Sequence, residues 1–263
     1  YTVLATGGIG GIFEHSTNYK HLTGDAIALA LKYGIKLQHI DYIQIHPTTL
    51  YTEKEGSREF LISESVRGEG AILLNSKGER FVNELLPRDV VANAIFAEMK
   101  KEGSKHVWLS MAPIPEDEIR THFPNIYQRC LDEGYDVTRE PIPVVPSQHY
   151  FMGGIDVDRY SKTSMERLYA AGETACNGVH GKNRLASNSL LESLVFAKRA
   201  AGQMTEGYIT LDAEKEQEIL NNPVITEEAT YAGYAEQYKK AVLAAIEKEK
   251  EYHEQYQYDV ERG

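Results

Sequence analysis

Short blocks of apolar and polar residues alternate along the first two thirds of the chain. Blocks of strand type are separated by blocks with helical spacing, and glycines follow the helical blocks. This alternation predicts an α/β protein. The predicted strands are residues 3–5, 42–45, 153–158 and 167–173, a hairpin turns at NSKGE within residues 71–81, and helices span residues 24–33 and 89–101. The stretch 113–145 is expected to hold two short helices and a proline-rich passage, EPIPVVP.

One predicted helix has a polar entry that a purely structural helix does not need. In HGKNRLASNSLLESLVFAKRAAG, residues 180–202, an apolar face begins at Leu190, and Ser187, Asn188 and Ser189 precede it. The first turn of a helix presents unpaired backbone N–H groups and the positive end of the helix dipole. This entry is therefore predicted to face negative charge.

A second helical pattern begins after residue 204 on a more charged background. Aromatic and apolar residues recur there at helical spacing, namely Tyr231, Tyr234, Tyr238, Val242, Ala245 and Ile246. The spacing predicts an amphipathic helix in a separate helical region.

Charge and cysteine content narrow the classes of partner. The chain has 28 Lys and Arg against 39 Asp and Glu, so its formal net charge is −11, and no basic stretch is present. Nucleic acid and anionic membranes are therefore poor candidate partners. Cys130 and Cys176 lie far apart without neighbouring ligand residues, which predicts neither a metal site nor a disulfide and fits a cytoplasmic protein. No apolar run is long enough to cross a bilayer.

The first residues read as a strand that belongs inside a larger sheet. YTVLATGG has no Met before it and no targeting segment after it, so the chain is expected to be a piece of a longer protein. GGIGG, which follows the strand, lacks the third glycine of a GxGxxG motif. We therefore do not interpret it as a phosphate-binding loop.

Three cationic or titratable side chains stand where secondary structure alone does not require them. Arg88 precedes Asp89, the expected N-cap of helix 89–101, where the helix dipole disfavours a cation by about 0.3–1 kcal/mol. His46 ends a predicted strand, and His149 lies just before two glycines that would let a ligand approach the backbone. A solvated or paired arginine and hydrogen-bonded structural histidines are the alternatives.

Other polar residues also have two interpretations. Glu173 follows a strand and a glycine, where a carboxylate can accept both hydroxyls of a ribose. Asp25 begins helix 24–33, where N-capping is the alternative. The remaining candidates, which are also consistent with surface ion pairs, are Ser63, Glu64, Arg67 and Arg184.

Six short motifs occur in one order along the chain. They are HPTTL, SESVRGEGA, LPRDVVA, HYFMGGI, AAGE and KNRLASNSLLESLVF. In this order the sequence resembles the flavoprotein family of fumarate reductases, succinate dehydrogenases and L-aspartate oxidases over roughly residues 1–204. Within that family the oxidases are most similar, because the helix entry reads ASNSLLE and Gln148 precedes the histidine in PSQHYFMGGI.

The resemblance implies a domain organisation. A Rossmann-like FAD-binding domain (residues 1–38 and 152–204) would be interrupted by an α+β capping domain (residues 39–151), and residues 205–263 would begin a helical C-terminal domain. The family's dinucleotide-binding glycine motif and an acid directed at the substrate amine would lie before Tyr1. On this basis the isolated chain is expected to be inactive.

The resemblance also implies roles for the candidate residues. FAD would be bound by Asp25, Glu173, Asn188, Ser189 and Leu190. A dicarboxylate substrate would be bound by His46, Ser63, His149 and Arg184, and the catalytic residues would be Arg88, Glu64 and Arg67.

Three functions remain open at this point. The first is oxidation of L-aspartate to iminoaspartate with O₂ or fumarate as electron acceptor, which would supply quinolinate synthase on the route to NAD. The second is a fumarate reductase or succinate dehydrogenase flavoprotein, because the dicarboxylate skeleton is the same. The third is a catalytically silent fragment that binds no flavin.

Overall fold

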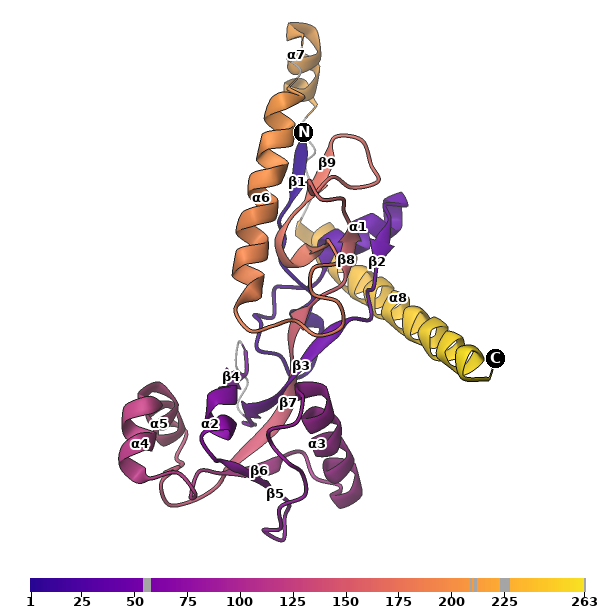
Figure 1. Cartoon of the computed structure of the whole chain (residues 1–263). Coiled ribbons are helices and arrows are strands. Elements are labelled where there is room, and N and C mark those ends of the chain that lie inside the picture. The colour runs from indigo at the N-terminus through magenta and orange to yellow at the C-terminus, as the bar shows by residue number, and fades with distance from the viewer. Residues whose placement is uncertain (54–57, 209, 211, 223–227, 263) are drawn as a thin grey trace. The chain divides into compact units, whose positions relative to one another are not determined.

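The chain folds into two compact units. The computed structural model describes residues 1–53, 58–208, 210, 212–222 and 228–262 (Figure 1). We call Tyr1–Ile12, His21–Ile43 and Tyr150–Gly263 the terminal unit, and Phe13–Lys20 with Gln44–His149 the inserted unit. The inserted unit thus includes a short segment, residues 13–20, that the sequence pattern did not assign to it.

The terminal unit combines two small sheets with helices. Strands β1 (Thr2–Leu4) and β9 (Leu168–Ala170) pair in parallel, and Figure 1 shows them side by side. A second sheet has the order β10 (Ala175–Cys176), β8 (Gly154–Asp156) and β2 (Leu37–Gln38). The helical elements are η1 (Gly10–Ile12), α1 (Asp25–Tyr33), η2 (Gly172–Thr174), α6 (Asn188–Glu206), α7 (Ala213–Asn221) and α8 (Glu228–Arg262).

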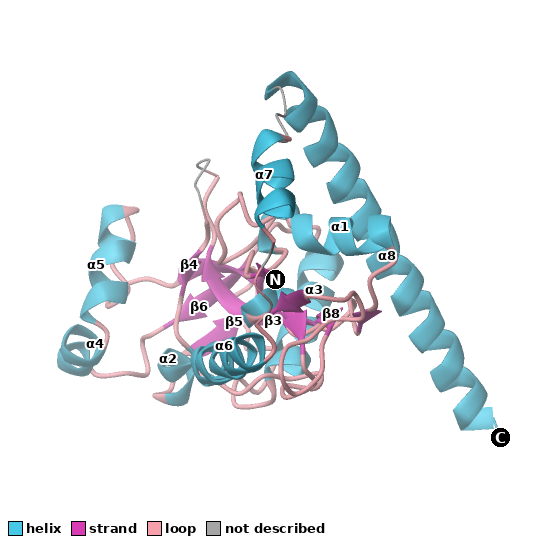
Figure 2. Ribbon diagram, turned by 90° about the horizontal axis from the view of Figure 1, so that it is seen from above, coloured by secondary structure: helices cyan, strands magenta, loops and turns pink. Residues whose placement is uncertain are grey.

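The inserted unit is built on one sheet of five strands, four of which are labelled in Figure 2. The strand order is β4 (Phe60–Leu61), β3 (Ile43–Leu50), β7 (Ile142–Phe151), β6 (Val107–Ser110) and β5 (Ile72–Leu74). The helices are α2 (Glu64–Gly68), α3 (Arg88–Glu102), α4 (Glu116–His122) and α5 (Pro124–Asp132). Its core is one apolar cluster in which Leu73, Ile95 and Leu109 are fully buried. The mixed α/β class predicted from the sequence is confirmed.

Glycines end the predicted helices as expected. Helix α1 stops at Gly34 and α3 at Gly103, and both glycines adopt the left-handed conformation. The start of α3 differs from the prediction, because Pro87 is the N-cap and Arg88 is the first helical residue. Asp89 is therefore not the cap.

Two proline-containing passages are strands rather than loops. Strand β3 does not end at His46 but continues through Pro47 to Leu50. Among the described residues, β4 pairs with β3 at Thr49 and Leu50. Pro47 lies outside this pairing, so its missing N–H removes no hydrogen bond between β3 and β4. The EPIPVVP passage lies largely in β7, where the carbonyl oxygen of Pro143 still accepts a hydrogen bond from the Tyr51 N–H.

Burial along the two long helices differs. In α8, Val242 and Ile246 are only 1% and 2% exposed, so the predicted amphipathic helix is confirmed. The side chain of Tyr231 lies outside the described residues. In α6 the leucines of the predicted apolar face are exposed, while Glu192 is buried. None of the described helices is both long enough and apolar enough to span a membrane.

A close backbone contact in the terminal unit requires glycine at position 153. A Cβ on Gly153 would lie 1.9 Å from the carbonyl oxygen of His39. We expect Gly153→Ala to lower the free energy of unfolding by about 2–4 kcal/mol, because backbone atoms have to move. Denaturant titration measures this change.

The matched control is Gly202→Ala in α6, where an added Cβ meets no atom within 4 Å. This variant should be neutral or more stable by up to about 1 kcal/mol, because alanine favours helix. Equal stability changes in the two variants would contradict the steric argument.

Candidate functional site

Two histidines meet on neighbouring strands of the inserted unit. His46 on β3 and His149 on β7 have ring centroids 5.5 Å apart. Burial lowers the pKa of His46 well below its usual value, and the charges of His149, Arg88 and Arg67 lower it further. His46 is therefore a neutral imidazole near neutral pH.

A carboxylate joins two arginines next to these histidines. Arg88 donates from Nε to Oε2 of Glu64 at 2.9 Å, and Nη2 of Arg67 lies 3.7 Å from Oε1 of the same carboxylate. The hydrogen bond from Arg88 lowers the pKa of Glu64. Ser63 accepts a hydrogen bond from the Ser65 N–H and so caps α2, which gives it a structural role in addition to the predicted one.

The two guanidinium groups have buried N–H donors for which the described part of the chain provides no acceptor. Arg67 is 2% exposed, and its Nη1 donates to the carbonyl oxygen of Glu84 at 2.8 Å. Nε and Nη2 of Arg67 and Nη1 of Arg88 are buried and have no hydrogen-bond partner among the described residues. Buried unpaired donors on a cation are costly, so an anion that accepts from them would be strongly favoured. The alternative for Arg67, a surface ion pair, is correct in the pairing with Glu64 but wrong in the surface position, because Arg67 is buried.

The segment that positions His149, residues 16–18, was not predicted from the sequence. Thr17 places Oγ1 2.8 Å from Nδ1 of His149. Ser16 and Asn18 donate to Oε1 of Gln148 at 2.7 and 2.8 Å. The only signal in the sequence is the run STN, which has no periodicity that would assign it to this sheet.

The terminal unit holds a second group of predicted residues around Glu173. Its carboxylate accepts from the Phe151 N–H at 2.9 Å. A Cβ on Gly8 would lie 2.3 Å from Oε1 of Glu173, so only glycine leaves room for this carboxylate. Burial raises the pKa of Glu173 to about 7, although the Phe151 N–H and Arg184 oppose the increase.

A buried carboxylate that the sequence analysis did not select lies at the centre of this group. Glu192 on α6 accepts from Tyr150 Oη at 2.9 Å and from Asn177 Nδ2 at 2.7 Å, and lies 2.7 Å from Nε2 of His180. The guanidinium of Arg184 lies 4.4 Å from the ring centre of Tyr150. The sequence signal that was available is the position of Glu192 between Leu191 and Leu194, in a largely apolar part of the helix.

The surroundings of Arg184 also correct the alternative interpretation of this residue. Arg184 is 6% exposed and donates from Nη1 to the carbonyl oxygen of Leu185 at 3.1 Å. Its guanidinium is therefore buried, and Arg184 is not a surface residue.

The remaining predicted residues lie at helix starts. Ser187, with φ 62°, is the N-cap of α6 without a side-chain cap, and α6 begins at Asn188 with Ser189 and Leu190 in its first turn. Asp25 is the first residue of α1 and accepts from Thr23 Oγ1 at 2.8 Å, whereas Gly24 is the N-cap. N-capping by Asp25 is therefore wrong.

Comparison with known proteins points to a flavin cofactor. The family model described as FAD binding domain matches residues 1–190. The L-aspartate oxidase of Clostridium perfringens is 59% identical over 199 residues, which cover 76% of this chain and 45% of that protein. The L-aspartate oxidase of Clostridium acetobutylicum is 55% identical over 219 residues, covering 83% and 50%. The chain thus spans about half the length of the curated relatives that it matches.

A solved structure shares the fold. The quinol fumarate reductase of E. coli superposes with a TM-score of 0.68 at 31% identity, covering 91% of this chain and 42% of that chain. The residues of the terminal unit fit FAD in chemical type: Glu173 is a half-buried acceptor for sugar hydroxyls, and the first turn of α6 offers backbone N–H groups.

The raised pKa of Glu173 makes the stability of the protein pH-dependent. The folded state favours the protonated carboxyl, so its stabilising effect is complete below the usual pKa of 4.5 and is lost as the pH rises through about 7. Across this range we expect the free energy of unfolding to fall by about 3 kcal/mol relative to Glu173→Gln. Parallel stability–pH curves for the two proteins, measured without FAD, would contradict this expectation.

Proposed function

Because the chain belongs to the FAD binding domain family, we propose that the protein carrying it oxidises L-aspartate to iminoaspartate. The observation that carries the proposal is the set of buried, unaccepted N–H donors on Arg67 and Arg88, whose charges reach His46. A substrate carboxylate would satisfy these donors, and the names of the relatives indicate which carboxylate substrate to test first.

The proposed substrate site combines cationic and neutral donors. His46 would donate a directed hydrogen bond without adding charge, and Thr17 would hold His149 in position for a second one. Arg184 would bind a carboxylate through its planar fork, and Ser63 would contribute a hydroxyl. These contacts would hold the α-carbon of the substrate in position for the loss of a hydride, and bound FAD would supply the hydride acceptor.

Arg88, Glu64 and Arg67 form the proposed route for protons. The side chain of Glu64 is 47% exposed and contacts both arginines, so it connects a buried guanidinium to solvent. In fumarate reduction Arg88 would give a proton to the substrate carbon. In aspartate oxidation its charge would act near the forming imine.

The cofactor contacts are proposed from the terminal unit. Glu173 would accept from the ribose hydroxyls and Asp25 would contact the cofactor. The first turn of α6, with Asn188, Ser189 and Leu190, would face the part of the flavin ring where negative charge develops. The electron acceptor would be O₂ or fumarate, and the product would pass to quinolinate synthase in NAD biosynthesis.

A second candidate is a fumarate reductase or succinate dehydrogenase flavoprotein, which the fold shared with the E. coli quinol fumarate reductase favours. Anaerobic bleaching of the FAD absorbance distinguishes the two. Bleaching by L-aspartate supports the oxidase, whereas bleaching by succinate alone supports the second candidate.

Substitution of Arg88 tests its proposed role in proton transfer. In the FAD-loaded protein, Arg88→Leu should reduce fumarate reduction about 10³-fold or more while FAD content is retained. Arg88→Lys should restore part of aspartate oxidation but little fumarate reduction. Steady-state rates with each substrate measure both effects.

The control is Arg120→Lys, because Arg120 forms an exposed ion pair with Glu116 within α4. It should leave both rates unchanged. Equal rescue of both reactions by Arg88→Lys would argue against a separate proton-donor role, and wild-type rates in Arg88→Leu would place Arg88 outside the active site.

Arg184→Lys tests carboxylate recognition. Lysine keeps the charge but lacks the planar guanidinium group. The transition-state stabilisation calculated from kcat/KM for L-aspartate should therefore fall by about 2–3 kcal/mol. Arg199→Lys, at an exposed position of α6, should have no effect. If Arg184→Lys turns over aspartate at the wild-type rate, Arg184 has only a structural role.

A further inference from the structure

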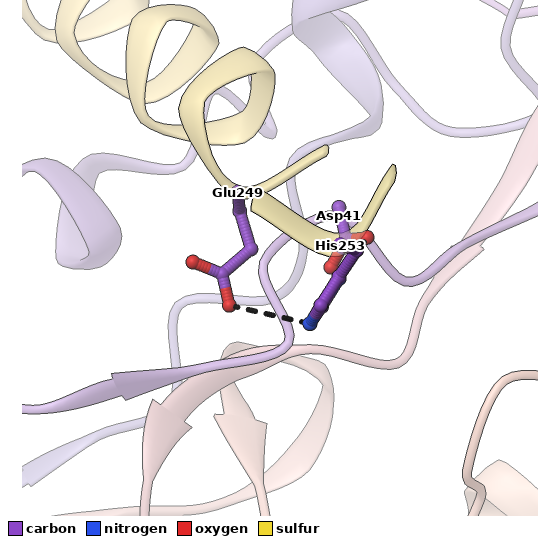
Figure 3. A group of neighbouring side chains, drawn as sticks. All are labelled: Asp41, Glu249 and His253. Carbon is purple, nitrogen blue, oxygen red and sulfur yellow. Dashed lines mark hydrogen bonds and ion pairs between the residues drawn. The ribbon is translucent and has the colours of Figure 1, made fainter. Parts of the chain in front are cut away.

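Three potential metal ligands that have no role in the proposed function meet in the terminal unit. Asp41 lies in the turn before β3, and Glu249 and His253 lie one turn apart on α8 (Figure 3). Nδ1 of His253 is 2.8 Å from Oδ2 of Asp41, and Nε2 of the same ring is 3.9 Å from Oε1 of Glu249. The spacing i, i+4 places both helical residues on one face of α8.

The ligand atoms are already close to the separation that one metal ion requires. One nitrogen or oxygen atom from each of the three residues lies within 4.8 Å of the others. Around a Zn²⁺ with bonds of about 2.0–2.2 Å, neighbouring tetrahedral ligands lie about 3.3–3.6 Å apart. Small side-chain rotations would therefore close the site.

The electrostatics of the group favour a divalent cation. Two carboxylates and one imidazole carry a charge of about −2 when the ring is neutral. Oδ1 of Asp41 is buried, and no atom of the described residues forms a hydrogen bond with it. An unpaired, buried carboxylate oxygen beside a second carboxylate is costly unless a cation neutralises it.

We propose that Asp41, Glu249 and His253 bind one divalent transition-metal ion of the Zn²⁺ class, through one carboxylate oxygen each from Asp41 and Glu249 and one ring nitrogen of His253. Imidazole selects such ions over Mg²⁺ and Ca²⁺, which prefer oxygen ligands alone. The bound ion would tie α8 to the turn before β3. This site is independent of the proposed oxidase function.

Zinc titration of the purified, metal-stripped protein tests the proposal. Calorimetry with ZnCl₂ should detect one equivalent that Mg²⁺ does not displace, and the Tm should rise with Zn²⁺. His253→Ala and Glu249→Gln should each weaken binding about tenfold or more. Asp41→Asn, which is nearly isosteric, provides a second test at the loop position if His253→Ala fails to fold.

Two control variants separate this site from other zinc binding. Glu69, Glu118 and His122 form a second, exposed group of potential ligands, so His122→Ala should leave the proposed site intact. Glu251→Gln makes the same charge change as Glu249→Gln at an exposed position of α8. The proposal is overturned if no zinc binds, if folded His253→Ala or Glu249→Gln binds as the wild type does, or if His122→Ala abolishes the binding.

Discussion

The buried charge of Arg67 is the constraint on which the candidate site depends. The Arg67 guanidinium is charged in its resting state at physiological pH, so its burial has to be compensated by acceptors. The carbonyl oxygen of Glu84 accepts one N–H and the carboxylate of Glu64 lies nearby, but two nitrogens of Arg67 have no acceptor in the part of the chain that the structure describes. The same field favours the neutral form of His46. A site with these properties favours the binding of an anion and disfavours a further cation.

A comparable arrangement organises the terminal unit around a buried acid. Glu192 holds Tyr150, Asn177 and His180 through short contacts, and the ring of Tyr150 in turn supports the guanidinium of Arg184. Because each of these side chains has a fixed partner, Arg184 is restrained in direction as well as in position. Such restraint reduces the conformational entropy that a side chain loses when it binds a ligand.

Local signals in the sequence predicted much of the fold, and long-range contacts explain what they missed. Helix ends at Gly34 and Gly103 follow from local backbone geometry, and they were predicted correctly. The strand was predicted to end at His46, before Pro47, because the sequence alone does not show where β4 pairs with β3. The contact between Thr17 and His149 joins residues 132 positions apart, and no periodicity encodes it. The motifs identified the family correctly, whereas Glu192, the acid that organises the terminal unit, was not selected.

The contact between Gly8 and Glu173 has a consequence for protein design. An added Cβ at position 8 would overlap the carboxylate, so the two residues have to be treated together although they are 165 positions apart in the chain. A designer who transfers Glu173 to another scaffold also has to transfer the loop after β1, with a glycine at the position of Gly8. A library that varies position 8 alone would contain mostly sequences in which the carboxylate of Glu173 is displaced, and a library that varies position 173 alone would contain mostly sequences that lack this carboxylate. The useful unit of redesign is therefore the pair.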